Sequence, residues 1–213
     1  MTTELPVSTE FPPTTELPRA RSARVAVTGT GLVLPGPGGT ACTDLPGFWS
    51  VISEGTCCLT TLDREDLGLR IGGQVRGWDR AEAIGVDPEA AARMSRAGQL
   101  ATAATRSALR EACLAPEELD GRTVLVCASL QFAFAETERY FARRAAGGPA
   151  SLKLDYWMTG TPPSVLGTVA STLRIACPTL NISGSCNVAL RALDVIGGMF
   201  RAGDIDRAIL VGV

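Results

Sequence analysis

Continuous apolar runs of strand length recur along the chain, with little of the polar alternation that marks a half-exposed strand. They lie at Arg24–Thr28, Thr123–Cys127, Pro178–Ile182 and Asp206–Val213. A strand that is apolar on both sides has both faces covered, as in a parallel sheet between layers of helices. The pattern therefore predicts strands of a buried, mainly parallel sheet.

Stretches with apolar residues three or four positions apart separate these runs and predict helices. They cover Leu45–Gly55, Asp87–Cys113, Ala135–Ala145, Val165–Leu173 and Cys186–Gly203. The second opens with a capping Asp87, a proline at the first helical position and an acid in the first turn. Strands that alternate with helices predict an α/β fold, with a mainly parallel mixed sheet covered by helices on both faces.

Other parts of the chain carry weaker patterns. Between Cys57 and Gly85 we expect an edge strand at Leu69–Val75 and a solvated acidic face, and residues 150–163 read as irregular. Phe48 and Trp49 are expected to anchor a core. Residues 1–22 are rich in Thr and Pro and lack an apolar period, which predicts a disordered tail ahead of one ordered unit at 23–213. The acidic face consists of Asp63, Glu65 and Asp66.

The composition indicates a folded domain and gives no sign of a nucleic-acid-binding or membrane-spanning protein. At 213 residues, with 46% hydrophobic content and a formal net charge of -2, the chain can bury a core and reads as one soluble domain or a large half of one. The longest basic run is Arg143-Arg144, so nothing predicts binding to nucleic acid or to an anionic membrane. No apolar run approaches the roughly 18 residues that a membrane-spanning helix needs.

The numbers and spacing of cysteine and histidine limit which disulfides, metal sites and catalytic pairs the chain can form. The seven cysteines form no C-x-x-C pair and the N-terminal stretch is not a hydrophobic leader, so we expect free thiols in a reducing cytoplasm. The chain contains no histidine. That absence removes zinc sites of the usual kind and any Cys-His pairing within the chain, and we expect neither a metal nor a bound cofactor.

One cysteine stands where a strand gives way to a helix. Pro178–Ile182 is followed by Ser183-Gly184-Ser185 and then by an alanine- and leucine-rich stretch that begins at Cys186. A thiol at a helix N-terminus lies near unpaired backbone N–H groups and the positive end of the helix dipole, which favour the nucleophilic thiolate. The alternative is that Cys186 is a small buried hydrophobe that caps a core helix.

A glycine pair near the start suggests a competing function. Gly29-Thr30-Gly31 follows the first predicted strand, as a phosphate-binding turn would. The dinucleotide fingerprint needs a third glycine that opens a helix, whereas Leu32–Gly39 reads as a loop. A nucleotide-binding protein is therefore the weakest of the hypotheses that the sequence allows.

Several collinear motifs together resemble the N-terminal half of a β-ketoacyl synthase, a thiolase-fold condensing enzyme of fatty acid or polyketide biosynthesis. The resemblance runs from about Arg24 to Val213. Its motifs are the opening strand and turn at Val25–Gly31, Phe48-Trp49 with Ile52 and Gly55, Met94-Ser95-Arg96, Cys186 at the active-site position, and Gly203–Ala208 followed by Ile209–Gly212.

The resemblance implies a role for Cys186 as an acyl-accepting nucleophile whose backbone N–H helps to form an oxyanion hole. The acyl group would come from the phosphopantetheine of an acyl carrier protein, and a carrier-bound malonyl unit would condense with it after decarboxylation. In the family that second step depends on histidines, assisted by a lysine, from the C-terminal half. A complementary ketosynthase half or ketosynthase-like subunit is therefore an expected partner, in a homo- or hetero-oligomer such as a dimer.

The chain departs from the family pattern in two places. Gly-Ser-Cys-Asn-Val surrounds Cys186, where the usual pattern is closer to Thr-Ala-Cys-Ser/Ala, and Ala128–Phe134 replaces a glycine-rich stretch. Phe132 and Phe134 are expected in the core or at an interface rather than in an acyl pocket. Three functions stay open: a nucleophile-bearing ketosynthase half, an inactive binding or scaffold subunit, and a stand-alone cysteine acyltransferase.

Overall fold

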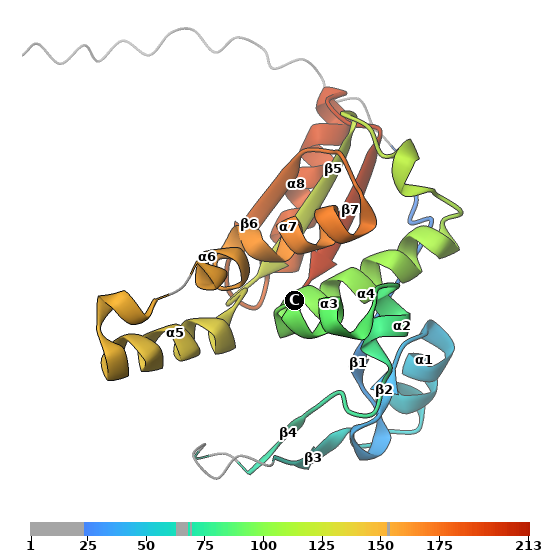
Figure 1. Ribbon diagram of the computed structural model, residues 1–213. Helices are drawn as coiled ribbons and strands as arrows, with labels where there is room; N and C mark the ends of the chain where they lie inside the picture. The colour runs from blue at the N-terminus through green and yellow to red at the C-terminus, as the bar shows by residue number, and fades with distance from the viewer. Residues whose placement is uncertain (1–23, 63–67, 69, 153) are drawn as a thin grey trace, which may run out of the picture.

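A three-stranded parallel sheet lies between α7 (Pro162–Leu173) and α8 (Val188–Ala202) in the upper part of the view (Figure 1). The structure is a computed structural model that describes residues 24–62, 68, 70–152 and 154–213. The strand order is β6-β5-β7, with β5 at Thr123–Ser129, β6 at Thr179–Ser183 and β7 at Arg207–Gly212. All seven residues of β5 are buried, as expected for a central strand covered on both faces.

Helices cover both faces of this sheet. On one face, α8 (Val188–Ala202) packs its Ala192 and Ile196 against Val124 and Val126 of β5. On the other face, α4 (Arg96–Glu111) and α7 (Pro162–Leu173) pack against the alternate β5 side chains, including Leu125. Burying each of the Val, Leu and Ile side chains among these contributes about 1.5–3 kcal/mol.

An ion pair sets the register where β5 and β7 begin. Arg122 donates from Nε to Asp206 Oδ2 at 2.5 Å and from its terminal nitrogen to Asp206 Oδ1 at 2.7 Å. A further hydrogen bond joins the guanidinium to the carbonyl oxygen of Gly203 at 3.1 Å. The Arg122 guanidinium also holds the pKa of the Asp206 carboxyl below its usual range. Thr123 thereby pairs with Arg207, and the ladder continues to Ala128 and Gly212.

The remaining elements precede β5 in the chain, except α5, α6 and the 3-10 turn between them, which lie between β5 and β6. Two short antiparallel ladders join β1 to β2 and β3 to β4. The elements are β1 (Leu34–Pro35), β2 (Ala41–Cys42), α1 (Leu45–Ser53), β3 (Leu59–Thr61), β4 (Ile71–Gly73), α2 (Arg80–Ile84), α3 (Pro88–Arg93), α5 (Phe134–Gly147) and α6 (Asp155–Thr159), with short 3-10 turns at Pro37–Gly39, Pro116–Glu118 and Pro149–Ser151.

The structure confirms most of the predicted elements. The strands expected at 123–127, 178–182 and 206–213 are β5, β6 and β7, and the helices expected at 45–55, 135–145 and 165–173 are α1, α5 and α7. The edge strand expected at 69–75 is the shorter β4. Residues 150–163, expected to be irregular, contain α6 and the start of α7. The predicted disordered tail at 1–22 and acidic face at Asp63, Glu65 and Asp66 lie outside the described residues.

Three further predictions were wrong. The run Arg24–Thr28 is not a strand, and Val25 and Val27 are 56% and 84% exposed. The helix expected over 87–113 is two helices, because Met94 is extended (ψ 148°) between α3 and α4. Trp49 is 69% exposed on α1 rather than buried in a core.

Candidate active site

The turn between β6 and α8 presents Cys186 to solvent. The strand ends at Ser183, the turn contains Gly184-Ser185-Cys186, and the backbone N–H of Val188 donates to the carbonyl oxygen of Ser185 at 2.9 Å. Cys186 is exposed. The interpretation of this residue as a small buried hydrophobe is therefore wrong, and its thiol is open to a reactant from solution.

The helix begins later than the sequence pattern indicates. Its first residue is Val188 and its N-cap is Asn187, whose side chain makes no capping hydrogen bond. Cys186 thus lies in the turn directly before the N-cap rather than in the first helical turn. The Ser185 hydroxyl is 3.7 Å from the Cys186 sulfur. Within the described residues, the backbone N–H of Cys186 makes no hydrogen bond, so it can serve an incoming oxyanion.

The carboxyl ends of all three sheet strands meet beside this turn. Ser129 ends β5, is paired with Ser183 of β6 and is almost fully buried. Its hydroxyl donates to the carbonyl oxygen of Val213 at 2.6 Å, and its own carbonyl oxygen accepts from the N–H of Gly184 at 3.3 Å. Ser129 therefore joins the ends of β6 and β7 to each other. In open α/β sheets, ligands bind at this carboxyl edge.

The sequence offered a signal for Ser129 that our interpretation did not use. Ser129 is the first polar residue after the apolar run Val124–Ala128, at the point where a buried strand ends. Polar residues in that position lie at the edge where parallel-sheet proteins place their sites. The sequence pattern around Cys186 does not by itself reveal this serine, which binds the Gly184 N–H in the cysteine turn.

The other thiols differ from Cys186 in their surroundings. Burial raises the pKa of the Cys127 thiol, in the middle of β5, to about 12. Burial likewise raises the pKa of Cys177, although a hydrogen bond from the Leu125 backbone N–H opposes the rise. Cys57 and Cys113 are exposed as Cys186 is, but neither lies at the carboxyl edge of the sheet.

The two aromatic residues after β5 have different environments. Phe132 is 5% exposed and belongs to the core cluster with α7, which confirms the expectation of a core role. Phe134 is 62% exposed at the first residue of α5.

A large cavity of about 960 Å³ lies along the outer edge of β7, and Cys186 is not among the residues that line it.

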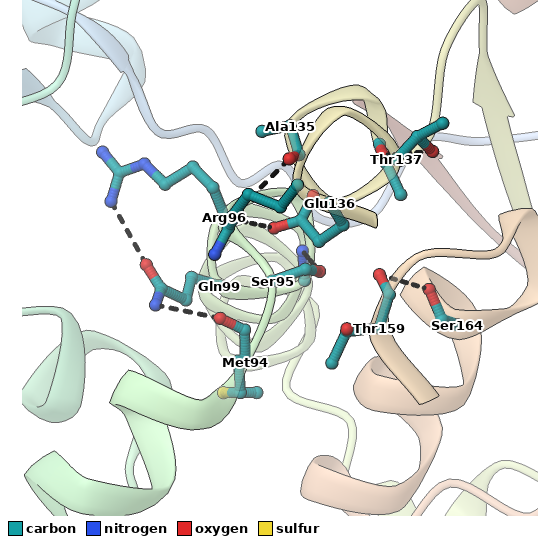
Figure 2. A network of polar contacts seen from close by, with 12 residues as sticks. Met94, Ser95, Arg96, Gln99, Ala135, Glu136, Thr137, Thr159 and Ser164 are labelled. Atoms are coloured by element: carbon teal, nitrogen blue, oxygen red, sulfur yellow. Dashed lines mark hydrogen bonds and ion pairs between the residues drawn. The ribbon is translucent and has the colours of Figure 1, made fainter. Parts of the chain in front are cut away.

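The Met94-Ser95-Arg96 motif forms the junction of α3 and α4. The Ser95 hydroxyl accepts from the N–H of Gly98 at 3.0 Å and caps α4. The buried Gln99 amide donates to the carbonyl oxygen of Ala91 at 2.8 Å. It also donates to the carbonyl oxygen of Met94 at 3.4 Å (Figure 2). Arg96 lies over the Trp78 ring at 5.5 Å, and partial burial lowers its pKa. The motif therefore positions helices and is not part of the cysteine turn.

Among the residues that the structure describes, no three His, Cys, Asp or Glu side chains are grouped so that they could hold a metal ion. Within the same residues, none of the helices combines the length and the hydropathy that crossing a bilayer requires.

Comparison with known sequences gives one family match over nearly the whole chain. The family described as "Beta-ketoacyl synthase, N-terminal domain" matches residues 22–213. The tetracenomycin polyketide synthase ketoacyl synthase alpha subunit of Streptomyces glaucescens is 28% identical over 203 residues, which cover 88% of this chain and 45% of that protein. The chain thus spans about half the length of this curated relative.

Solved structures of ketosynthases share the fold. The ishigamide ketosynthase/chain length factor superposes with a TM-score of 0.69 at 20% identity, over 87% of this chain and 46% of that one. A β-ketoacyl synthase from Burkholderia phymatum STM815 gives 0.68 at 18% identity, over 84% and 44%. A type II PKS acyl-carrier protein in complex with its ketosynthase bound to the hexaketide gives 0.68 at 24%, over 87% and 44%. These likenesses confirm the predicted N-terminal half of a thiolase-like fold.

Proposed function

This chain belongs to the β-ketoacyl synthase family through its N-terminal domain, and from that premise we propose that it is the nucleophile-bearing half of a polyketide or fatty acid ketosynthase. The observation that carries the proposal is the position of Cys186. It is an exposed thiol in the turn between β6 and α8, beside the edge where the carboxyl ends of β5, β6 and β7 meet.

The step assigned to this chain is a transthioesterification. The Cys186 thiolate attacks the carbonyl carbon of a thioester carried by the phosphopantetheine of an acyl carrier protein. The tetrahedral intermediate places its negative oxygen near the Cys186 N–H, which makes no hydrogen bond within the described residues. When the intermediate collapses, the carbon–sulfur bond to the carrier breaks, and the carrier thiolate takes up a proton while the acyl group stays on Cys186.

The second step needs groups that this chain does not contain. Decarboxylation of a malonyl unit yields a carbanion, which attacks the acyl–Cys186 thioester and releases the cysteine thiolate. In the family, histidines from the other half assist that step, and this chain has none. We therefore propose a complementary ketosynthase half or ketosynthase-like subunit as a partner, beside the carrier protein. The solved relatives include a ketosynthase/chain length factor and a ketosynthase with its acyl-carrier protein.

The outer face of α8 supports such an association. Leu190 is 69% exposed there, away from the buried Ala192 and Ile196, and Leu193 is 54% exposed where this face borders the cavity along β7. Gly197 continues the same face one turn further on. Exposed leucines next to a glycine allow another helix to approach closely, and such patches mark protein interfaces.

A direct test is acyl transfer from a radiolabelled acyl carrier protein to the purified full chain. We expect one acyl group per chain, located on Cys186 by mass spectrometry of tryptic peptides. The Cys186→Ala variant should lose the label, and Cys57→Ala, which removes another exposed thiol, should keep it. Absence of acyl transfer, or label distributed over several exposed cysteines, contradicts the proposal.

The two alternatives give different results in that assay. A catalytically inactive scaffold subunit binds the carrier without taking up acyl groups. A stand-alone acyltransferase takes up the acyl group on Cys186 and passes it to an acceptor without carbon–carbon bond formation. Adding malonyl carrier together with the complementary half separates them, because only the proposed ketosynthase half then yields carbon dioxide and a β-ketoacyl product.

A further inference from the structure

The Ser185 hydroxyl lies beside the reactive atom of the candidate active site. Its oxygen is 3.7 Å from the Cys186 sulfur, and the hydroxyl is the donor in this contact. Among the residues that the structure describes, no other side chain makes a hydrogen bond to that sulfur. Both residues are exposed, so the contact lies at a surface that a reactant from solution can reach.

The backbone on either side of this hydroxyl is held in place. The carbonyl oxygen of Ser185 accepts from the N–H of Val188, the first residue of α8, at 2.9 Å. The N–H of Gly184 donates to the carbonyl oxygen of Ser129, at the end of β5, at 3.3 Å. A Cβ at Gly184 would lie 3.2 Å from a methyl carbon of Val188, so the turn is closed tightly against the helix. The Ser185 side chain therefore projects from a fixed turn next to the cysteine.

A hydroxyl in this position favours the ionised form of the neighbouring thiol. The thiolate is the nucleophile and can only accept hydrogen bonds, whereas a serine hydroxyl can rotate its proton toward an acceptor. A hydrogen bond to the charged form stabilises that form over the neutral one. Hydrogen bonds to charged groups are also stronger than those between neutral groups. The Ser185 contact is therefore strongest once Cys186 has lost its proton.

The chain contains no imidazole that could take this role. Histidine is a common activator of a cysteine nucleophile, and the sequence has none. Ser183, the other serine of the turn, makes no hydrogen bond to the sulfur within the described residues. In the ketosynthase pattern alanine precedes the cysteine, so the Ser185 hydroxyl is a feature in which this chain departs from that pattern.

We propose that Ser185 is a catalytic residue of the acyl transfer to Cys186, and that its hydroxyl donates a hydrogen bond to the sulfur as the thiolate forms. The inference rests on the function proposed above and adds no covalent step to it. The thiol proton passes to solvent at this exposed turn, and the Ser185 proton stays on its own oxygen. The hydrogen bond weakens as the sulfur bonds to the acyl carbon, because the negative charge then moves to the carbonyl oxygen.

Alkylation of the purified full chain by iodoacetamide, from about pH 6 to about pH 10, tests this role without a carrier protein. We expect Ser185→Ala to slow the modification of Cys186 at least about threefold near pH 7. The deficit should disappear near pH 10, where the thiolate forms without assistance. Ser185→Thr keeps a hydroxyl and should keep the rate, and Ser183→Ala is the matched control that should also keep it. Peptide mass spectrometry compares Cys186 with the exposed Cys57 in the same sample.

Two results of this experiment overturn the inference. Equal rates for Ser185→Ala and the unmodified sequence near pH 7 would show that the hydroxyl does not support the thiolate. A deficit of the same size at every pH would show that the substitution changes access to the sulfur rather than its ionisation.

Acyl transfer from the labelled carrier separates this inference from the function on which it rests. We expect Ser185→Ala to slow the transfer near pH 7 by a factor similar to that for alkylation. If the unmodified chain and Ser185→Ala take up the acyl group at equal rates, the proposed function stands and the role of Ser185 is wrong. If the unmodified chain takes up no acyl group while the pH-dependent alkylation deficit is present, the hydrogen bond to Cys186 is upheld and the proposed function is wrong.

Discussion

At the scale of single residues, the environment of each cysteine decides its chemistry. Cys127 occupies the centre of a fully buried strand, where the charged thiolate is disfavoured and the pKa is raised to about 12. Cys186 lies in an exposed turn where a reactant can approach. The same residue type is thus a packing element at one position and a candidate nucleophile at the other.

This contrast predicts the order of alkylation by iodoacetamide near neutral pH. Cys186 should be modified first, and Cys127 should be protected in the folded chain by burial and by a thiolate fraction about 1,000-fold below that of an ordinary thiol. Peptide mass spectrometry over a time course measures both. Cys57 is the matched exposed control, and equal rates at Cys57 and Cys186 would favour the scaffold alternative.

The Thr30–Glu111 contact predicts a pH effect. The Thr30 hydroxyl, followed by its backbone N–H, lowers the pKa of the Glu111 carboxyl. A lowered folded-state pKa contributes stability above the unfolded-state pKa, near 4.3, and the contribution disappears as the pH falls through the folded-state value. Thr30→Val should raise the Glu111 pKa in an NMR titration and flatten the acid limb of the stability profile. An unchanged titration would show that the hydroxyl contact does not persist in solution.

At the scale of elements, a local cap explains why residues 87–113 form two helices, whereas the apolar periodicity predicts one. Apolar spacing is continuous across 87–113, so the sequence predicts one helix there. Ser95 interrupts it because its hydroxyl binds the N–H of Gly98, which requires extended backbone at the cap. Serine is a common cap residue, but the sequence does not show whether a serine within a helical pattern caps a new helix or lies inside one continuous helix.

Ser95→Ala should destabilise the chain by about 1 kcal/mol, since one helix N-terminus loses its side-chain cap. Urea unfolding followed by circular dichroism measures the change. Ser107→Ala, within the same helix and away from its caps, is the matched control and should be neutral or slightly stabilising. A neutral result for Ser95→Ala would mean that α3 and α4 do not depend on this junction.

At the scale of the whole molecule, apolar strands were predictable from the sequence, but which strands pair with one another was not. β5, β6 and β7 are apolar because both of their faces are covered, and this leaves a pattern in the sequence. The segment 24–28 has the same pattern but lies outside the sheet, because strand composition does not specify a pairing partner. The strand–turn–helix around Cys186 was predictable, whereas the Ser129 contact depends on residues distant in sequence.

The exposed face of α8 predicts how the chain associates. Leu190→Glu should weaken binding to the complementary half by at least about tenfold, because a charge replaces an apolar contact in the interface. Analytical ultracentrifugation of the mixed halves measures this effect. Leu45→Glu changes an exposed leucine on α1 and should leave the association unchanged. Equal behaviour of both variants would place the interface elsewhere.

The Arg122–Asp206 pair sets the position of the opposite end of the sheet. Seven residue steps along β7 lead from Asp206 to Val213, a span of about 23 Å at 3.3 Å per residue. A slip of one residue at Arg122 would shift the carboxyl end of β7 by the same step and carry the Val213 carbonyl away from Ser129. The Arg122–Asp206 ion pair, at the amino end of β7, therefore determines the position of the Val213 carbonyl beside the candidate active site at the other end of the strand.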